Sequence, residues 1–231
     1  MVRACCASVE YRDGHAAVAC TLKAETFMLP FDVILLDIGG VLLTNGWDSR
    51  DRASVLERFE LDRSEFEVRH RAVYDPWLVG AISAEAYLAH TVFYQERPFA
   101  PHEFFSAVCN QSNVLPQGAM GILQALAASD RYVLVAANNE ARETNTYRFE
   151  RFGLDKLFDV ALSSCFLGLR KPNPAYFERA LELLCASAGR ILFIDDREEN
   201  VAAAEAVGIC AVRFVDEGQL RGRLEELGVV L

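Results

Sequence analysis

The fold is decided by residues 31–43, which read FDVILLDIGGVLL. The four apolar residues 33–36 form a run too short for a helix, and Asp37 follows them directly, with Gly39 and Gly40 close behind. This pattern predicts a buried strand that stops at a turn. Because ligands of an open parallel sheet bind at the carboxyl ends of its strands, Asp37 is a candidate site residue. An Asp that merely ends a strand is the alternative.

Three further stretches end in groups that handle phosphate or a divalent cation. Residues 133–138 read VLVAAN, residues 169–174 read LRKPNP, and residues 191–196 read ILFIDD. The first and third are apolar runs that end on polar side chains, and the second places Lys171 just before an expected helix. Taken singly, Lys171 fits a solvated loop, and a carboxylate pair fits a helix N-terminus.

In this order the four stretches resemble the four motifs of the haloacid dehalogenase-like hydrolases, from about residue 31 to the C-terminus. The most specific parts of the likeness are Asp37 with its glycine turn, Lys171, and Asp195-Asp196 followed by Asn200. The first motif, Asp-x-Gly-Gly-Val, is most similar to the glucose-1-phosphate phosphatase branch of that superfamily. The resemblance implies an α/β fold, a doubly wound parallel sheet with an inserted all-helical cap.

Composition limits the classes of partner and compartment. The 231 residues, 52% of them hydrophobic, can bury one substantial core with room for a smaller module. A net charge of -10 argues against nucleic-acid and anionic-membrane surfaces. Seven cysteines without a Cys-x-x-Cys spacing fit neither a disulfide framework nor a zinc site. No apolar run reaches bilayer length. We expect a cytoplasmic monomer or homodimer.

The chain divides into three expected parts. Residues 1–30 form an N-terminal extension, in which Asp13-Gly14 is a hairpin turn signal, although a domain start near Met28 is an equal alternative. Residues 31–47 and 115–231 form the α/β catalytic core. Residues 48–114 carry apolar residues at helical spacing, with helix starts at Ser83 and Pro101, and they are expected to form the helical cap.

Beyond residue 115 the pattern alternates between strand and helix, which implies a parallel sheet covered on both faces. Expected strands are 132–137, 158–163, 190–195 and 209–214, and expected helices are 116–128, 140–152, 174–187, 198–207 and 217–227.

The carboxylates of Asp37, Asp195 and Asp196 would repel one another if they lay close together. A divalent cation such as Mg²⁺ usually offsets such repulsion. The resemblance implies that Asp37 is the nucleophile of an aspartyl-phosphate intermediate. It also implies that Asp37, Asp196 and the Gly39 carbonyl bind the metal, and that Asp195 binds it through water or orients Lys171.

The resemblance also assigns roles around the phosphate of a small phosphorylated metabolite. Lys171 is expected to neutralise charge on the nucleophile and on the phosphoryl oxygens. Gly40, Asn138 and Asn139 are expected to contact the phosphate, through backbone N–H groups and the Asn138 side chain.

Two positions depart from the family pattern. Gly39 stands where related phosphatases usually carry an acid-base Asp, and Ala137 stands where they carry a Ser or Thr hydroxyl. The leading hypothesis is therefore a Mg²⁺-dependent phosphomonoesterase. A catalytically weak or inactive domain that binds a phosphorylated ligand or a protein partner is the second. A metal-free hydrolase of carbon–halogen bonds is the third, and it gains little from two adjacent carboxylates beside the nucleophile.

Overall fold

The computed structural model describes residues 10–12, 15–17 and 29–231. Strands β1 (Glu10–Arg12) and β2 (His15–Ala17) pair antiparallel, with residue 10 opposite residue 17. This pairing is the one that a hairpin turning at Asp13-Gly14 requires. Those two turn residues, and Met28 as the alternative domain start, lie outside the described residues.

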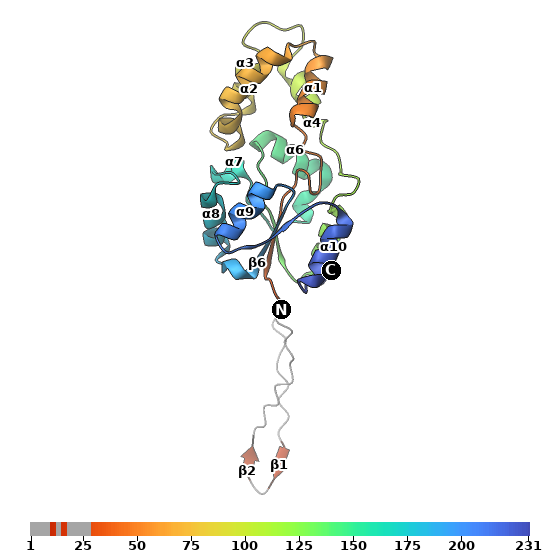
Figure 1. The fold of residues 1–231 in the computed structure, drawn as a ribbon, viewed down its shortest axis with the longest axis vertical. Coiled ribbons are helices and arrows are strands. Elements are labelled where there is room, and N and C mark those ends of the chain that lie inside the picture. The colour runs from red at the N-terminus through yellow and green to blue at the C-terminus, as the bar shows by residue number, and fades with distance from the viewer. Residues whose placement is uncertain (1–9, 13–14, 18–28) are drawn as a thin grey trace.

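The remaining strands form one parallel sheet of five, in the order β5-β4-β3-β6-β7 (Figure 1). The strand predicted from residues 33–36 is its centre. The predicted α/β fold with a doubly wound parallel sheet is confirmed. The strands are β3 (Val33–Leu36), β4 (Val133–Ala136), β5 (Val160–Ala161), β6 (Ile191–Asp195) and β7 (Cys210–Arg213).

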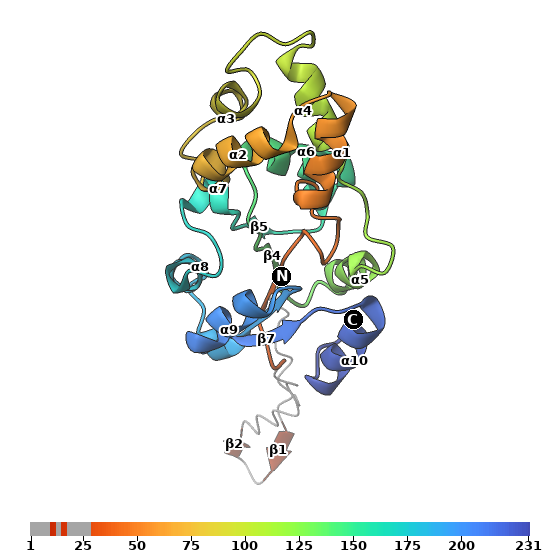
Figure 2. The same ribbon diagram turned by 45° about the horizontal axis from the view of Figure 1, so that its top comes forward.

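Helices cover both faces of the sheet because successive strand residues point to opposite sides. Ile34 and Leu36 of β3 pack in a cluster with residues of α5, α6 and α10, whereas Val33 and Leu35 pack with α8 and α9. Figure 2 shows α8 and α9 on one side of the core and α5 and α10 on the other. These helices are α5 (Met120–Ser129), α6 (Arg142–Phe152), α8 (Pro174–Leu184), α9 (Glu198–Ala206) and α10 (Glu217–Glu226), with the 3-10 turns η1 (Leu154–Lys156) and η2 (Ala188–Arg190) between elements.

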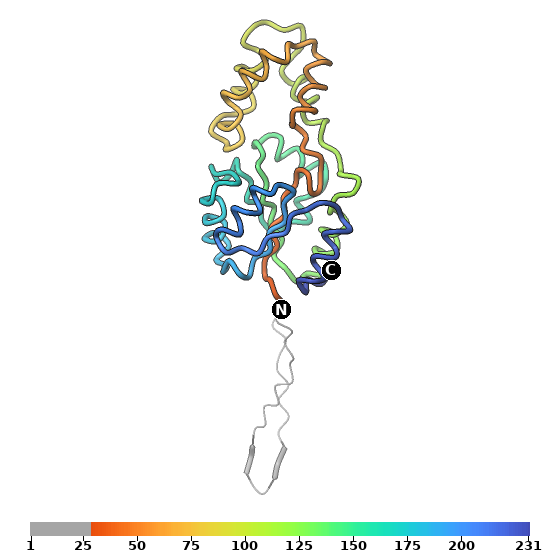
Figure 3. Tube along the Cα trace, in the orientation of Figure 1, coloured from red at the N-terminus to blue at the C-terminus, as the bar shows by residue number. Residues whose placement is uncertain are grey.

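Four helices between β3 and α5 gather beyond the carboxyl edge of the sheet (Figures 1 and 3). They are α1 (Ser49–Arg58), α2 (Arg63–Leu78), α3 (Ala84–Thr91) and α4 (Pro101–Cys109). Ser83 caps α3 and Pro101 opens α4, as predicted. The four helices share an aromatic core of their own, separate from the two clusters on the sheet. Within the described part of the chain, none of the helices combines the length and apolar character needed to cross a membrane.

Hydrogen bonds attach this helical group to the core next to β4. Glu143 of α6 accepts from Trp77 Nε1 at 3.2 Å and from the backbone N–H of Ala84 at 2.9 Å. Ser164 Oγ donates to the carbonyl oxygen of Leu78 at 2.7 Å. Ser164 opens α7 (Ser164–Leu167), a short helix that the sequence pattern did not indicate. The C-terminal end of α2 is therefore held above the carboxyl edge of the sheet.

A buried histidine contributes to the core of the helical group. Tyr87 Oη accepts from Trp47 Nε1 at 3.0 Å and lies 2.8 Å from His70 Nδ1. Because the Trp47 N–H can only donate, the single hydroxyl proton of Tyr87 is free to go to Nδ1, which suits a neutral imidazole. Burial lowers the pKa of His70 to about 4. His70 therefore has a packing role in this core.

We expect the protein to lose stability in mild acid through His70. Its pKa is about 4 in the folded state against 6.5 when solvated, so unfolding takes up a proton between these two values. The stability that the protein gains from keeping His70 neutral is complete above pH 6.5 and is lost as the pH falls toward 4. At pH 5 the loss is about 2 kcal/mol at most. Urea unfolding at pH 7.5 and 5.0 should show a smaller acid loss in His70→Gln. Equal losses in both proteins would contradict this.

Candidate active site

The strand register brings the predicted acidic residues together. Leu36 pairs with Ile194 on one side and with Ala136 on the other, so the residues that follow them emerge at the same edge. Asp37 donates its backbone N–H to the carbonyl oxygen of Ile194 at 2.9 Å. Asp37, Asp195 and Asp196 each offer a carboxylate oxygen within 4.8 Å of the others. The candidate carboxylates therefore form one cluster.

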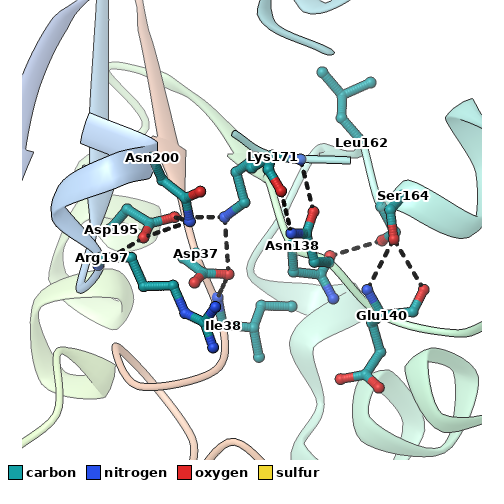
Figure 4. Close-up of polar contacts among 12 residues, drawn as sticks. Asp37, Ile38, Asn138, Glu140, Leu162, Ser164, Lys171, Asp195, Arg197 and Asn200 are labelled. Carbon is teal, nitrogen blue, oxygen red and sulfur yellow. Dashed lines mark hydrogen bonds and ion pairs between the residues drawn. The ribbon is translucent and has the colours of Figure 1, made fainter. Parts of the chain in front are cut away.

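Lys171 places its ammonium group among these carboxylates (Figure 4). Its Nζ is 3.2 Å from Asp37 Oδ1 and 2.5 Å from Asp195 Oδ2, and its side chain is only 1% exposed. Asn139 holds the Lys171 backbone from both sides, because its Oδ1 accepts from the N–H at 2.9 Å and its Nδ2 donates to the carbonyl at 2.8 Å. The lysine is thus fixed at its backbone and at its charged end.

The electrostatics of the cluster follow from burial. Burial raises the pKa of Asp37 to about 7 against the opposing effect of Lys171, and the other two carboxylates add to the rise. Burial also raises the pKa of Asp196, with a further contribution from Asp195. Burial alone would lower the pKa of Lys171, but Asp37 and Asp195 outweigh it and the pKa is raised. When all three carboxylates are ionised, as they would be with a bound cation, one ammonium leaves an excess of two negative charges.

The cluster fits a divalent cation. Asp196 Oδ1 is buried and has no hydrogen-bond partner among the described residues, which is the state of an oxygen available to a metal. Gly40 gives Asp196 its room, because a Cβ there would lie 2.4 Å from Asp196 Oδ2, and its φ of +79° favours glycine. Mg²⁺ prefers such hard oxygen ligands. The donor set and the charge excess both suit it.

Asp195 differs from its two neighbours because both of its oxygens are occupied. Oδ1 accepts from Arg197 N at 2.9 Å and from Asn200 Nδ2 at 2.9 Å, and Oδ2 lies against Lys171 and Asn200. Its side chain is fully buried. Of the two roles expected for Asp195, these contacts favour the orientation of Lys171.

Two of the groups expected to contact the phosphate are bonded within the protein, namely the Asn138 side chain and the Gly40 N–H. Asn138 donates to Asn145 Oδ1 at 2.9 Å and accepts from Ser163 Oγ at 2.8 Å. Gly40 spends its N–H on the carbonyl of Leu43 at 2.7 Å, which closes the glycine turn. The side chain of Asn139 holds Lys171, as described above.

Backbone groups remain available instead. Within residues 29–231, the N–H groups of Gly39, Asn138 and Asn139 make no hydrogen bond. All three residues line the same pocket as Asp37. Free backbone N–H groups at the end of a strand are suited to anion binding. The carboxyl edge of β3 and β4 therefore offers backbone donors to a phosphate, although no side-chain hydroxyl is present at Ala137.

A pocket of about 350 Å³ opens beside the carboxylate cluster, between the sheet edge and α1 and α2. It includes Asp37, Gly39 and Lys171 in its lining, together with side chains that the sequence analysis did not single out. The polar ones among these are Asn45, Asp48, Ser49, Arg52, Tyr74, Glu140, Arg148, Arg170 and Arg197. No motif marked these residues because they come from five separate stretches of the chain.

The space beside Gly39 is filled by other polar groups. A Cβ at Gly39 would lie 3.0 Å from Asn45 Oδ1 and 3.8 Å from Arg148 Nη1. Arg148 is buried and pairs with Glu140, which also accepts from Thr144 Oγ1 at 2.6 Å. The position of the expected acid-base Asp is thus next to an amide and a buried ion pair. Only the spatial neighbourhood reveals this arrangement.

Comparison with known families agrees with this geometry. A family described as haloacid dehalogenase-like hydrolase matches residues 31–208, well over half of the chain. The chain belongs to this family. The haloacid dehalogenase-like match includes all four stretches that carry Asp37, Asn138, Lys171 and Asp195, and it also spans the four helices inserted after β3.

The curated relatives of this hydrolase include phosphatases. Phosphatase MT3486 of Mycobacterium tuberculosis is 26% identical over 212 residues, covering 78% of this chain and 94% of that protein. Sesquiterpene phosphatase astK of Aspergillus oryzae is 40% identical over 60 residues, 26% of this chain and 31% of its own length. A chloroplast flavin mononucleotide hydrolase of Arabidopsis thaliana is 28% identical over 163 residues, 71% of this chain and 65% of its own length. The chain therefore spans less than two thirds of the last two.

A solved structure supports the fold. A haloacid dehalogenase family enzyme of Bacteroides thetaiotaomicron, in complex with magnesium and inorganic phosphate, superposes with a TM-score of 0.69 at 17% identity. The superposition covers 80% of this chain and 95% of that enzyme.

Proposed function

We propose that this haloacid dehalogenase-like hydrolase is a Mg²⁺-dependent phosphomonoesterase of small phosphorylated metabolites. The observation that carries the proposal is the buried cluster of Asp37, Asp195 and Asp196 with Lys171 bonded to two of them. Phosphatases among the distant relatives, and magnesium and phosphate in the Bacteroides enzyme, support it. We also propose that the chain belongs to the glucose-1-phosphate phosphatase-like branch, which the first motif, Asp-x-Gly-Gly-Val, supports.

Asp37 would be the nucleophile. A carboxylate oxygen attacks phosphorus, the bond from phosphorus to the ester oxygen breaks, and the leaving alkoxide takes a proton from water. Water then attacks the aspartyl-phosphate, loses a proton to solvent, and releases inorganic phosphate with the Asp37 carboxylate restored. Lys171 stays protonated throughout and offsets charge on Asp37 and on the phosphoryl oxygens.

The other groups would bind and orient the phosphate. Backbone N–H groups of Gly39, Asn138 and Asn139 donate to its oxygens, in place of the hydroxyl missing at Ala137. Asp37, Asp196 and the carbonyl of Gly39 would hold Mg²⁺, which when bound neutralises phosphate charge. Asp195 keeps Lys171 in place through its buried ion pair.

We propose the same division into domains as the sequence pattern indicates. Residues 48–114 would form a cap over a core of residues 31–47 and 115–231, because α1–α4 have an aromatic core of their own. The cap contributes Asp48, Ser49, Arg52, Tyr74 and Leu78 to the pocket and would thereby select the substrate. We also propose a cytoplasmic location, which the free thiols of Cys109, Cys165, Cys185 and Cys210 support.

A catalytically weak domain that binds a phosphorylated ligand is the second candidate. Gly39 carries no acid-base group, and a positioned one is typically worth about 10² to 10⁴ in rate. Hydrolysis of carbon–halogen bonds is disfavoured, because the buried Asp196 Oδ1 without a partner suits a metal site and has no use in a metal-free one.

Metal removal tests the proposal on the wild-type enzyme. We expect phosphate release from p-nitrophenyl phosphate and from at least one member of a panel of phosphorylated metabolites. EDTA should reduce this release by roughly 10²-fold or more, because the excess negative charge would then repel the phosphate, and added Mg²⁺ should restore it. Release that EDTA leaves unchanged would contradict a metal-dependent site. Binding of phosphorylated ligands without turnover would favour the second candidate, and halide release from a 2-haloacid would favour the third.

A further inference from the structure

The pocket beside the carboxylate cluster is lined mainly by polar and charged groups. Besides Lys171 it contains four arginines, Arg52, Arg148, Arg170 and Arg197. Its aliphatic or indole side chains are Leu78 and Trp47, which are only 4% and 5% exposed. A long apolar substrate would therefore find little apolar surface to cover. The ligand that the pocket can bind therefore depends on which of these arginines are already paired with carboxylates of the protein.

Two of the four arginines are neutralised within the protein. Arg52 makes two hydrogen bonds to Glu67, at 2.8 and 3.0 Å, and both side chains are largely buried. Arg148 pairs with Glu140 and also donates to the backbone carbonyl of Thr44. Arg52 thereby links two helices of the cap, and Arg148 holds the loop after β3. Both charges are therefore already paired, and Arg148 Nε is the part of these two groups that is buried without a hydrogen-bond partner among the described residues.

The other two arginines are available. The Arg197 guanidinium pairs with Glu199 at 3.9 Å, and both side chains are more than half exposed. Arg170 pairs with Asp75 of the cap at 3.1 Å, with side chains 39% and 61% exposed. Exposed pairs of this kind contribute little and exchange readily. Figure 4 shows the Arg197 side chain extending from the start of α9 toward Asp37.

Tyr74 brings a hydrogen-bond donor from the cap to the same region. Among the hydrogen bonds of the described residues none involves the Tyr74 hydroxyl, and Tyr74 lines the pocket. Arg170 and Arg197 line the same pocket as this hydroxyl. Two cations in exposed ion pairs and a neutral donor therefore line this pocket together.

We propose, resting on the phosphatase function above, that the substrate is a compact phosphomonoester with a second anionic group, a carboxylate or another phosphate. Arg197 and Arg170 bind that group and Tyr74 donates to it, while the ester phosphate lies at Asp37. The pocket volume of 350 Å³ corresponds to about 12 water molecules, which leaves room for a small metabolite. The second anionic group of the substrate would thus be the strong partner that Arg170 and Arg197 do not have within the protein.

Matched substrates test this inference. We would compare kcat/KM for 2-phosphoglycolate, for ethylene glycol bisphosphate, and for the neutral amide of 2-phosphoglycolate, with p-nitrophenyl phosphate as the general phosphatase substrate. We expect at least one charged ester to exceed the amide by roughly tenfold or more, the usual effect of a hydrogen bond to a charged group. Comparison of the two charged esters distinguishes a carboxylate from a phosphate.

Substitutions then assign the preference to its residues. Arg197→Met should reduce the ratio of charged to neutral ester roughly tenfold. Asp75→Asn should raise the ratio, because it releases Arg170 from its acidic partner. Arg179→Met is the matched control, since Arg179 is an exposed arginine paired with Glu182 on α8, outside the pocket.

The outcomes separate the two proposals. Hydrolysis of p-nitrophenyl phosphate with equal kcat/KM for the amide and both charged esters would overturn the second anionic group and leave the phosphatase standing. A ratio that Arg197→Met and Arg179→Met change equally would overturn the assignment to Arg197. No phosphate release from any of the four esters would overturn the phosphatase, and the inference with it.

Discussion

Asp37→Asn is expected to abolish phosphate release, with kcat falling by about four to six orders of magnitude. The amide matches the carboxylate in size, but its oxygen is a poor nucleophile and it carries no charge for a cation. Asp37 lies at the end of the central strand, and its hydrogen bond to the backbone of Ile194 is made by its own backbone. The fold should therefore survive the substitution. Phosphate release with saturating Mg²⁺ is the measurement.

The design separates lost chemistry from lost structure. Lys171 retains Asp195 as a partner in the variant, and one buried negative charge is removed from a cluster that has too many. We therefore expect a melting temperature in EDTA no lower than that of wild type. Asp155→Asn, on the exposed surface of η1, serves as the matched control and should keep full activity. Turnover that persists in Asp37→Asn would exclude this residue as the nucleophile.

Lys171→Met is expected to damage both stability and activity. The ammonium group is buried and is the shared partner of Asp37 and Asp195. Removing one partner of a buried ion pair typically costs about 3–5 kcal/mol, because the remaining charge is left uncompensated. The loss of a cation at the reacting phosphate should also lower kcat by about 10² to 10³. Urea unfolding in EDTA and a Mg²⁺-saturated assay measure the two effects.

Addition of Mg²⁺ gives a sharper test of why Lys171 matters. If the variant is unstable because carboxylates repel one another, Mg²⁺ should recover more stability in Lys171→Met than in wild type. Lys156→Met, at an exposed lysine in η1, is the control and should change neither quantity. A Lys171→Met protein as stable as wild type in EDTA would show that the cluster is solvated rather than buried.

The sequence by itself determined the sheet and the acidic cluster at its edge. The apolar run before Asp37 and the one before Asp195 are long enough only for buried strands, and each ends on a carboxylate. Parallel pairing then leaves little freedom, because Leu36 lies opposite Ile194 and the carboxylates that follow must meet. Helix starts at Ser83 and Pro101 were also predictable, since caps act within one turn.

Only the tertiary structure decided how the polar groups near the site are used. The Asn139 side chain holds the backbone of Lys171, and the Asn138 side chain, which was expected to contact the phosphate, pairs with Asn145. The same residue types could have served either purpose, and the choice depends on partners brought close by folding.

The arginines of the pocket show the same limit. Arg148 is neutralised by a buried glutamate, whereas Arg197 pairs only with the exposed Glu199 at 3.9 Å, and nothing local in the sequence separates the two cases. Strands and caps follow from residues within a few positions of each other. The charge of a pocket depends on long side chains from distant segments, so it is settled only when the cap and the sheet edge come together.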